Sequence, residues 1–315
     1  MQEFVFEPPR PTMYLGNRAI GADYPVFIIA EIGTSHGGNL DQGYRLIDAA
    51  ARAGADCAKF QVVFADEIIH PDTGDVPLPG GKVPLFERFR SLERDADFYA
   101  ALKRHTEEAG LVFLSSAFGI RSARILRDLG VGALKIASPE LNHLPLLREV
   151  SSYSLPLIVS TGVSMIADIE QATEVLGRRG LSLLHCVTAY PAPVTDYNLR
   201  VMQNLEQLFG VPVGVSDHSR DPITVPALSA ALGAAVVEKH ITLSNEGDGL
   251  DDPVALAPDD FRTMVGAIRR ARGEGLQTTA ARVGDSLGAA VVGKVLGDGV
   301  KRLAASERAN YTRTN

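Results

Sequence analysis

Two apolar segments of this chain each end at a histidine with an acidic residue one or two positions before it. The first, residues 213–218, reads Val-Gly-Val-Ser-Asp-His, and the second, residues 235–240, reads Ala-Val-Val-Glu-Lys-His. Imidazoles bind Mn²⁺, Fe²⁺, Co²⁺ or Zn²⁺, and two of them leave positions open for water and substrate. Either histidine alone is better explained as a buried, hydrogen-bonded side chain. Because His218 and His240 end two segments of the same kind, we interpret the pair as a metal site.

Two lysines lie inside apolar segments, where an ammonium group is costly to bury. Lys59 lies within Cys-Ala-Lys-Phe-Gln at 57–61, and Lys135 lies between Leu134 and Ile136. Desolvating an ammonium costs far more than one hydrogen bond returns. We therefore predict that both lysines receive a phosphate or carboxylate, helped by serine hydroxyls at other strand ends. These serines are Ser116, Ser138, Ser160 and Ser216.

Other interpretations of these residues stay open. Either lysine would also suit a structural ion pair with Glu31 or Glu140, or a Schiff base with a carbonyl substrate. Glu238 lies two residues before His240 on one strand face, so it either orients an imidazole or acts as a third metal ligand. His185 is either a site residue or a packed core histidine.

The elements that position these residues follow from the hydrophobic pattern. Residues 223–232, between the two histidine segments, are rich in alanine and leucine and predict a helix, so the region forms a βαβ unit with parallel strands. The same alternation gives eight predicted strands, at 26–31, 56–61, 112–115, 133–137, 157–160, 182–185, 213–216 and 235–238. Helices are predicted after nearly all of them, at 40–53, 97–109, 120–129, 165–176, 199–209, 223–232 and 258–272.

This alternation predicts an α/β fold of the (β/α)8 TIM-barrel type, which carries its site at the carboxyl ends of the strands. A doubly wound sheet is the alternative, but the Gly-rich stretch at 31–38 lacks the G-x-G-x-x-G spacing. We expect an N-terminal hairpin or plug at 1–21, a catalytic barrel at 22–275 and an extended C-terminal tail at 276–315. The long insertion at 62–95 predicts a lid or binding loop.

Composition excludes several classes of protein. The 315 residues carry a formal net charge of −7, which gives no broad basic face for nucleic acid or an anionic membrane. No apolar run approaches the ~20 residues of a membrane helix. The start of the chain lacks a basic stretch leading into an apolar one, so we expect a cytoplasmic protein. Cys57 and Cys186 are expected to be buried free thiols.

Ordered motifs between residues 27 and 307 resemble those of the N-acetylneuraminate (sialic acid) synthase family, enzymes that condense phosphoenolpyruvate with an amino-sugar aldehyde. The motifs are Ala-Glu-Ile-Gly at 30–33, His-Gly-Gly-Asn at 36–39, Ala-Gly-Ala-Asp at 53–56, Lys-Phe-Gln at 59–61, Phe-Leu-Ser-Ser-Ala-Phe at 113–118, Leu-Lys-Ile-Ala-Ser-Pro-Glu at 134–140, Ser-Thr-Gly at 160–162, Leu-His-Cys-Val-Thr-Ala-Tyr-Pro at 184–191, Ser-Asp-His-Ser at 216–219 and Glu-Lys-His at 238–240.

The resemblance implies a role for each matching residue. A manganese-type ion would lie on His218 and His240, with Mg²⁺, Co²⁺ or Zn²⁺ as alternatives. Phosphoenolpyruvate would be held by Lys59, Ser116, Lys135, Ser138, Ser160, Thr188 and Ser216. The acceptor sugar would face Gln61, Tyr190 and Asp251. The catalytic group would comprise Glu31, which takes part in proton transfer, and Lys59, Lys135, Glu238 and Asp251.

The sequence departs from the family pattern in three places. Family members usually continue into an antifreeze-like domain, which in a dimer brings an arginine to the partner's acceptor site. This chain stops at Asn315, so the resemblance implies a barrel-only member, and a homodimer through barrel faces stays open. Ala189 and Pro139 replace residues that are commoner at those positions. The acceptor loop at 248–253 keeps Asp251 among changed neighbours.

We therefore expect a metal-dependent synthase that condenses phosphoenolpyruvate with a sugar or related aldehyde to a 3-deoxy-2-ulosonic acid and releases phosphate. Two alternatives are a Schiff-base pyruvate aldolase or lyase and a non-catalytic barrel that binds a sugar acid. The expected partners are small molecules, with neither nucleic acid nor membrane among them.

Overall fold

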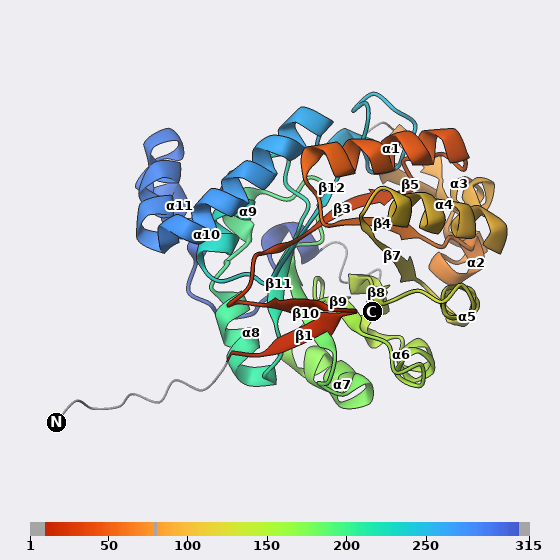
Figure 1. Cartoon of the computed structure of the whole chain (residues 1–315), viewed down its shortest axis with the longest axis horizontal. Helices are drawn as coiled ribbons and strands as arrows, with labels where there is room; N and C mark the ends of the chain where they lie inside the picture. The colour runs from red at the N-terminus through yellow and green to blue at the C-terminus, as the bar shows by residue number, and fades with distance from the viewer. Residues whose placement is uncertain (1–9, 79–80, 309–315) are drawn as a thin grey trace.

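The computed structural model describes residues 10–78 and 81–308. At its centre eight parallel strands form a closed barrel, in which β12 pairs with β3 to complete the ring (Figure 1). The predicted (β/α)8 fold is thereby confirmed. The strands are β3 (Phe27–Gly33), β4 (Cys57–Gln61), β7 (Val112–Ala117), β8 (Leu134–Ile136), β9 (Leu157–Ser160), β10 (Leu181–Cys186), β11 (Val213–Asp217) and β12 (Val236–His240).

The strands form where short apolar runs are covered on both faces, as parallel sheets require. All residues of β3 are buried, and so are all residues of β12. The hairpin of β1 (Thr12–Leu15) and β2 (Arg18–Gly21) packs Met13, Leu15 and Ile20 against Phe27 and Ile158 of the barrel interior. The hairpin thus closes one end of the barrel, so a cavity between the strands can open at the other end.

Helices cover the outside of the barrel. They are α1 (Leu40–Ala53), α4 (Ala96–Glu108), α5 (Ile120–Asp128), α6 (Leu144–Ser151), α7 (Ile166–Leu176), α8 (Val201–Phe209), α9 (Thr224–Ala231) and α10 (Pro258–Leu287). Helix α1 shows how the sequence sets their limits: Asn39 accepts a hydrogen bond from the Gln42 backbone N–H, and Gly54 takes a left-handed conformation with φ 90° at the other end. Helix α6 lies outside the predicted set, because a short helix with proline in its first turn has little periodicity to detect.

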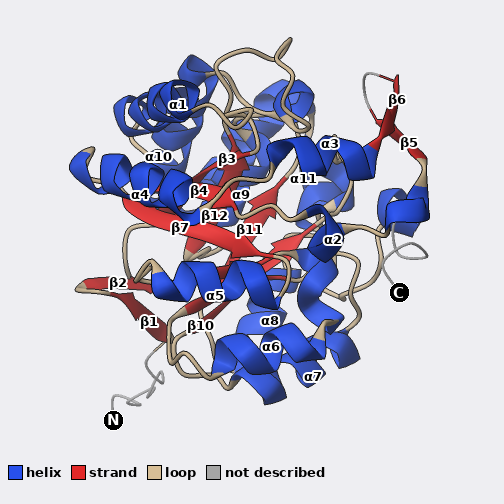
Figure 2. Ribbon diagram, turned by 90° about the vertical axis from the view of Figure 1, so that its right-hand side faces the viewer, coloured by secondary structure: helices blue, strands red, loops and turns tan. Residues whose placement is uncertain are grey.

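The insertion at 62–95 contains structure of its own. It folds into α2 (Ala65–Ile68), the 3₁₀ turn η1 (Pro71–Thr73), a hairpin of β5 (Asp75–Leu78) and β6 (Gly81–Pro84), and α3 (Leu85–Leu92). Figure 2 shows the β5–β6 hairpin projecting away from the barrel. Helix α3 lies closer, and its Phe89 lines the cavity at the carboxyl ends of the strands. The insertion therefore contributes to the site, as a binding loop was expected to.

The C-terminal extension differs from the expected extended tail over its first part. Helix α10 continues to Leu287 across a break at Gly275, where φ is 76°, and α11 (Ala289–Leu296) follows it. Gly273 and Gly275 interrupt the apolar pattern, yet the later turns bury Val283 and Val292. Figure 1 shows α10 and α11 together on one side of the barrel, beside α9. From residue 297 to 304 the chain lacks regular structure, and the turn η5 (Ala305–Glu307) follows.

None of the helices in the described ranges is long and apolar enough to cross a membrane.

Candidate active site

A cavity of about 200 Å³ opens at the carboxyl ends of the strands, and every predicted site residue lines it. These residues are Glu31, Lys59, Gln61, Ser116, Lys135, Ser138, Ser160, Thr188, Tyr190, Ser216, His218, Glu238, His240 and Asp251. The lining residues outside the predicted set are Phe89, Phe118, Ala137, Pro139 and Cys186. The convergence follows from parallel topology, because eight strands that run in one direction end at one mouth.

Strand register places the functional residues next to one another. Glu31 on β3 lies opposite Lys59 on β4 and opposite His240 on β12. On β7, Ser116 lies opposite Lys135 of the neighbouring strand β8. Residues two apart on a strand share a face. The charged side chains of Glu31, Lys59, Lys135 and Glu238, which come from four strands, therefore lie around the inside of one barrel mouth.

Lys59 sits in a buried cluster with two carboxylates. Its Nζ lies 2.8 Å from Glu31 Oε2 and 3.5 Å from Glu238 Oε2, and it donates a hydrogen bond of 3.3 Å to Ser116 Oγ. Burial lowers the pKa of Lys59, but the two carboxylates outweigh it, so the pKa is raised overall and the amine stays charged. The alternative of an ion pair with Glu31 is therefore confirmed for Lys59, although the pair lies inside the cavity.

Lys135 is held differently. Its Nζ donates to Ser160 Oγ at 2.6 Å and to the Ile136 carbonyl at 2.9 Å. Among the described residues it has no carboxylate partner within ion-pair distance, so the alternative of a pair with Glu140 is wrong. Burial lowers the pKa of Lys135, against the opposing effect of Glu238. This ammonium is 1% exposed and, in the described ranges, has Glu238 as a more distant opposite charge but no carboxylate within 4 Å.

The two histidine rings face each other across the cavity. Their centroids are 5.8 Å apart and their planes make an angle of 52°. His218 Nδ1 donates to the Val187 carbonyl at 3.0 Å, while Nε2 lies 3.2 Å from the Tyr190 hydroxyl. His240 Nδ1 lies 3.9 Å from Asp251 Oδ2. Burial lowers the pKa of His240 to about 4, which keeps this imidazole neutral, as a metal ligand must be.

These donors fit a catalytic metal ion better than a structural one. No group of three or more His, Cys, Asp or Glu side chains within the described ranges is arranged to hold a metal. A structural site needs about four protein ligands, whereas a catalytic site leaves positions to water and substrate. His218 and His240 supply two imidazole donors, so a metal ion held here would take its remaining ligands from water or substrate.

Glu238 links the lysines to the histidines. Burial raises the pKa of Glu238, but Lys135 and Lys59 outweigh it and hold the pKa down to about 2. Ser216 Oγ donates to Glu238 Oε1 at 2.8 Å and lies 3.3 Å from His218 Nε2. Of its two predicted roles, orienting an imidazole through Ser216 agrees better with these contacts than direct ligation.

Gln61, Asp251 and two aromatic side chains also line the cavity. Gln61 Nε2 donates to Glu31 Oε1 at 2.8 Å, and burial raises the pKa of Asp251 to about 6. Phe89 and Phe118 line the cavity with them. Phe118 ends the family motif at 113–118. The sequence marks Phe89 only as an aromatic residue within the insertion at 62–95, which was predicted to be a lid or binding loop.

His185 does not face this cavity. It is 4% exposed, and its Nε2 donates to the Tyr197 carbonyl. It lines a separate cavity near the C-terminal segment. Because its ring is buried and hydrogen-bonded, His185 is better described as a packed core histidine than as a residue of the strand-end cavity.

The fold and the cavity define a (β/α)8 barrel in which two lysines and two histidines line one cavity at the carboxyl ends of the strands. A model of the NeuB family matches residues 46–276, and the chain belongs to this family. The predicted resemblance to sialic acid synthases is thereby confirmed.

Individual relatives agree with this assignment. The chain is 40% identical over 265 residues to the spore coat polysaccharide biosynthesis protein SpsE of Bacillus subtilis, a match that covers 82% of this chain and 71% of SpsE. It is 33% identical over 292 residues to an N,N'-diacetyllegionaminic acid synthase of Campylobacter jejuni, covering 90% and 81%. The crystal structure of the N-acetylneuraminic acid synthetase of Leptospira borgpetersenii, in complex with citrate, matches with a TM-score of 0.77 at 30% identity and covers 96% of both chains.

Proposed function

We propose that this protein condenses phosphoenolpyruvate with a sugar or related aldehyde, forming a 3-deoxy-2-ulosonic acid and releasing phosphate. One observation carries the proposal: the ammonium groups of Lys59 and Lys135 and the imidazoles of His218 and His240 line the same cavity. The family assignment supports it, because relatives are named as synthases of sialic, legionaminic and pseudaminic acids.

Phosphoenolpyruvate carries a phosphate and a carboxylate, and one end of the cavity offers positive charge for both. Lys135 Nζ has no carboxylate within ion-pair distance among the described residues, and Lys59 is held in place by Glu31 and Glu238. Hydroxyl groups would add hydrogen bonds to the anion from Ser116, Ser138, Ser160, Thr188 and Ser216. Because the groups are fixed and mostly buried, they act in a low dielectric with little reorganisation.

His218 and His240 would hold a divalent metal ion, with Mn²⁺ foremost and Mg²⁺, Co²⁺ or Zn²⁺ as alternatives. When bound, the ion would polarise the acceptor carbonyl as a Lewis acid. The bond from His218 Nδ1 to the Val187 carbonyl keeps a proton on Nδ1, which leaves Nε2 as the ligating atom. Burial lowers the pKa of His218, but Cys186 outweighs it and raises the pKa to about 9, so metal binding would have to displace a proton from Nε2. Asp251 Oδ2 lies 3.9 Å from His240 Nδ1, beyond hydrogen-bond distance, and places a carboxylate beside the second imidazole.

The reaction joins C3 of phosphoenolpyruvate to the aldehyde carbon, and the aldehyde oxygen takes up a proton. Water adds at C2, losing a proton, and the tetrahedral intermediate expels inorganic phosphate to leave a 2-keto acid. Burial raises the pKa of Glu31 despite the nearby Lys59, which suits the carboxyl for proton transfer in these steps. Lys59 and Lys135 stabilise the charge on the departing phosphate.

The acceptor would lie against Gln61, Tyr190 and Asp251, with Phe89 and Phe118 as apolar walls. Polar groups beside aromatic rings suit a polyhydroxylated aldehyde with an apolar face, which is the chemistry of a sugar.

The decisive test measures phosphate release from phosphoenolpyruvate over a panel of sugar aldehydes. We expect release that needs both an aldehyde and Mn²⁺ and that disappears in His240→Ala. If no aldehyde of a broad panel supports release by the wild-type protein, the proposed activity is wrong.

A Schiff-base aldolase is the second candidate, and the lowered pKa of Lys135 favours it, because imine formation needs a neutral amine. Borohydride treatment with pyruvate separates the two. The synthase remains unmodified, whereas an aldolase gains a covalent adduct on the lysine. A barrel that only binds sugar acids is the third candidate, and a wild-type protein that takes up no Mn²⁺ in calorimetry would favour it.

We further propose a cytoplasmic location, which the buried free thiols of Cys57 and Cys186 suit. Association of barrel faces into a homodimer also remains a proposal, and sedimentation would test it.

A further inference from the structure

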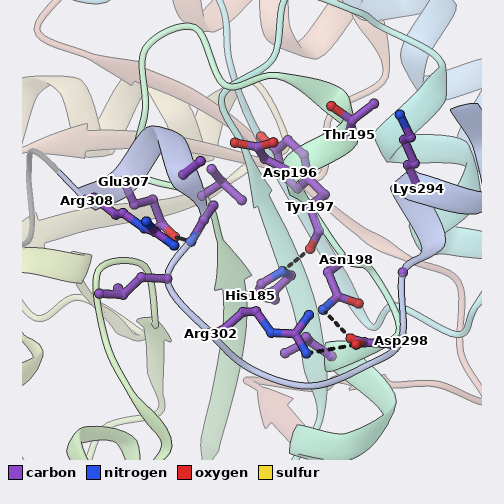
Figure 3. Close-up of a pocket in the computed structure, with 16 residues that line it drawn as sticks. His185, Thr195, Asp196, Tyr197, Asn198, Lys294, Asp298, Arg302, Glu307 and Arg308 are labelled. Atoms are coloured by element: carbon purple, nitrogen blue, oxygen red, sulfur yellow. Dashed lines mark hydrogen bonds and ion pairs between the residues drawn. The ribbon is translucent and has the colours of Figure 1, made fainter.

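The C-terminal segment 297–308 returns to the barrel and brings a carboxylate into its interior. Figure 3 shows this segment curving around the second cavity, with Asp298 and Arg302 towards one side and Glu307 and Arg308 towards the other. Arg302 and Arg308 are exposed, whereas Glu307 is only 1% exposed. A buried carboxylate in a segment that is mostly partly or fully exposed needs a physical reason, because its desolvation is costly.

The contacts of Glu307 supply that reason. Its Oε1 accepts hydrogen bonds from the backbone N–H groups of Val163 and Thr188, each at 2.9 Å. Its Oε2 accepts from the Ala304 N–H at 3.0 Å. One carboxylate oxygen therefore joins the loop after β9 to the loop after β10. Hydrogen bonds to an ionised acceptor are stronger than neutral ones.

Both loops carry groups that line the active-site cavity. Thr188 lines it directly, and Gly162, next to Val163, donates its N–H to Ser138 Oγ at 3.0 Å. Val163 has a φ of 46°, a conformation that a β-branched residue rarely adopts. Such a conformation persists only where surrounding contacts impose it, and the Glu307 carboxylate is one of these contacts.

We propose that Glu307 is a positioning residue for the phosphoenolpyruvate end of the cavity, acting through the backbone of Val163 and Thr188. The inference rests on the proposed function for the identity of the ligand. It assigns the C-terminal segment a part in substrate binding, although none of its residues lines the active-site cavity.

The segment has other anchors, which make controls available. Ser306 Oγ donates to Asp196 Oδ2 at 2.7 Å, and Arg302 pairs with Asp298 at 2.8 Å. The Ser306 contact reaches the loop after β10 at Asp196, eight residues beyond Thr188, and the Arg302 contact stays within the C-terminal segment. The Ser306→Ala variant thus loosens the segment without removing the acceptor of the two loop N–H groups.

The test compares Glu307→Ala, Glu307→Gln and Ser306→Ala in the full chain with Mn²⁺ present. For Glu307→Ala we expect the KM for phosphoenolpyruvate to rise roughly tenfold or more, because two buried donors lose their acceptor. The KM for the aldehyde should rise less than that for phosphoenolpyruvate, since Gln61 and Asp251 lie outside the two loops and Tyr190 alone of the three acceptor residues shares a loop with Thr188. Glu307→Gln keeps one amide oxygen as acceptor and should restore part of the affinity, and Ser306→Ala should behave like wild type.

Amide hydrogen exchange gives a second readout that needs no turnover. Exchange at Val163 and Thr188 should quicken in Glu307→Ala and stay slow in Ser306→Ala. Unchanged exchange at both amides, or equal increases in both KM values, would overturn the inference while leaving the proposed function intact. A wild-type protein that neither binds nor consumes phosphoenolpyruvate would overturn the proposed function, and with it the ligand named here.

Discussion

Lys59 Nζ lies 2.8 Å from Glu31 Oε2, and both side chains are almost completely buried at the mouth of the barrel. The pair is formed before any ligand arrives, so the anion meets an ammonium that is already charged and fixed. Lys135 stands in contrast, because its ammonium is held only by a hydroxyl and a carbonyl. This difference gives distinct predictions for the two lysines.

Replacing Lys59 should harm both folding and turnover. Lys59→Met leaves Glu31 and Glu238 buried without their cation, a change that typically costs about 3–5 kcal/mol. Denaturant unfolding would measure the loss, and phosphate release should fall to background. Adding Glu31→Gln to Lys59→Met should restore part of the stability but no activity. An active Lys59→Met protein would refute the assigned role.

Replacing Lys135 should separate stability from function. Lys135→Met removes a buried ammonium that has no ion-pair partner in the described part of the chain, but it also removes a charge that stabilises the Glu238 carboxylate, so the free energy of unfolding should fall less than in Lys59→Met. Phosphoenolpyruvate should no longer raise the melting temperature of the variant, although it raises that of the wild type. A large loss of stability would show that the ammonium has a counter-ion in the folded protein.

Metal removal should abolish turnover reversibly. After chelation and dialysis we expect no phosphate release, and Mn²⁺ should restore it. Mn²⁺ should also raise the melting temperature of the wild type but not that of His240→Ala. His70→Ala, which removes an exposed imidazole of the insertion, serves as the control and should respond like the wild type. Full activity after chelation would contradict the metal assignment.

Helix α3 should influence acceptor choice. Phe89→Ala removes a ring from the cavity wall, and kcat/KM for the aldehyde should fall roughly tenfold to a hundredfold, as expected for losing a buried phenyl contact. The KM for phosphoenolpyruvate should change little. Phe86→Ala removes a ring of the same helix that does not line the cavity, and both constants should stay near their wild-type values. Equal effects of the two variants would point to a general disturbance of α3.

Glu140 should make stability depend on pH. Burial raises its pKa to about 8, and its Oε2 has no hydrogen-bond partner. The folded protein therefore binds a proton that the unfolded chain loses above its ordinary pKa, so this group makes stability fall between about pH 4.5 and pH 8. The loss is on the order of 4 kcal/mol at the upper end.

Glu140→Gln should remove this slope, so that the variant is more stable than the wild type at pH 8 and similar at pH 4.5. Unfolding curves across that range measure the difference, and exposed Glu174→Gln is the control. Parallel pH profiles for Glu140→Gln and the wild type would show that Glu140 ionises normally in the folded state.

Much of the site can be predicted because local patterns identify strand ends. Apolar runs ending at Lys59, Lys135, His218 and His240 mark positions that a parallel barrel must bring together. The fold class follows from the same alternation, since strands and helices have different hydrophobic periods. The prediction of helices fails where hydrophobic periodicity is weak, as in α6 and in the part of α10 beyond Gly275. In these segments, packing against neighbouring elements decides that the chain is helical.

The sequence by itself determined the barrel and the set of residues at its mouth, because both depend on short-range periodicity and on the parallel direction of the strands. Only the tertiary structure decided which charges meet: Lys59 pairs with Glu31, while Lys135 and Glu140 remain apart. It also decided that Phe89 reaches the cavity and that Glu307 joins two loops more than a hundred residues before it in the chain. Such contacts depend on strand register and side-chain packing, which no local pattern encodes.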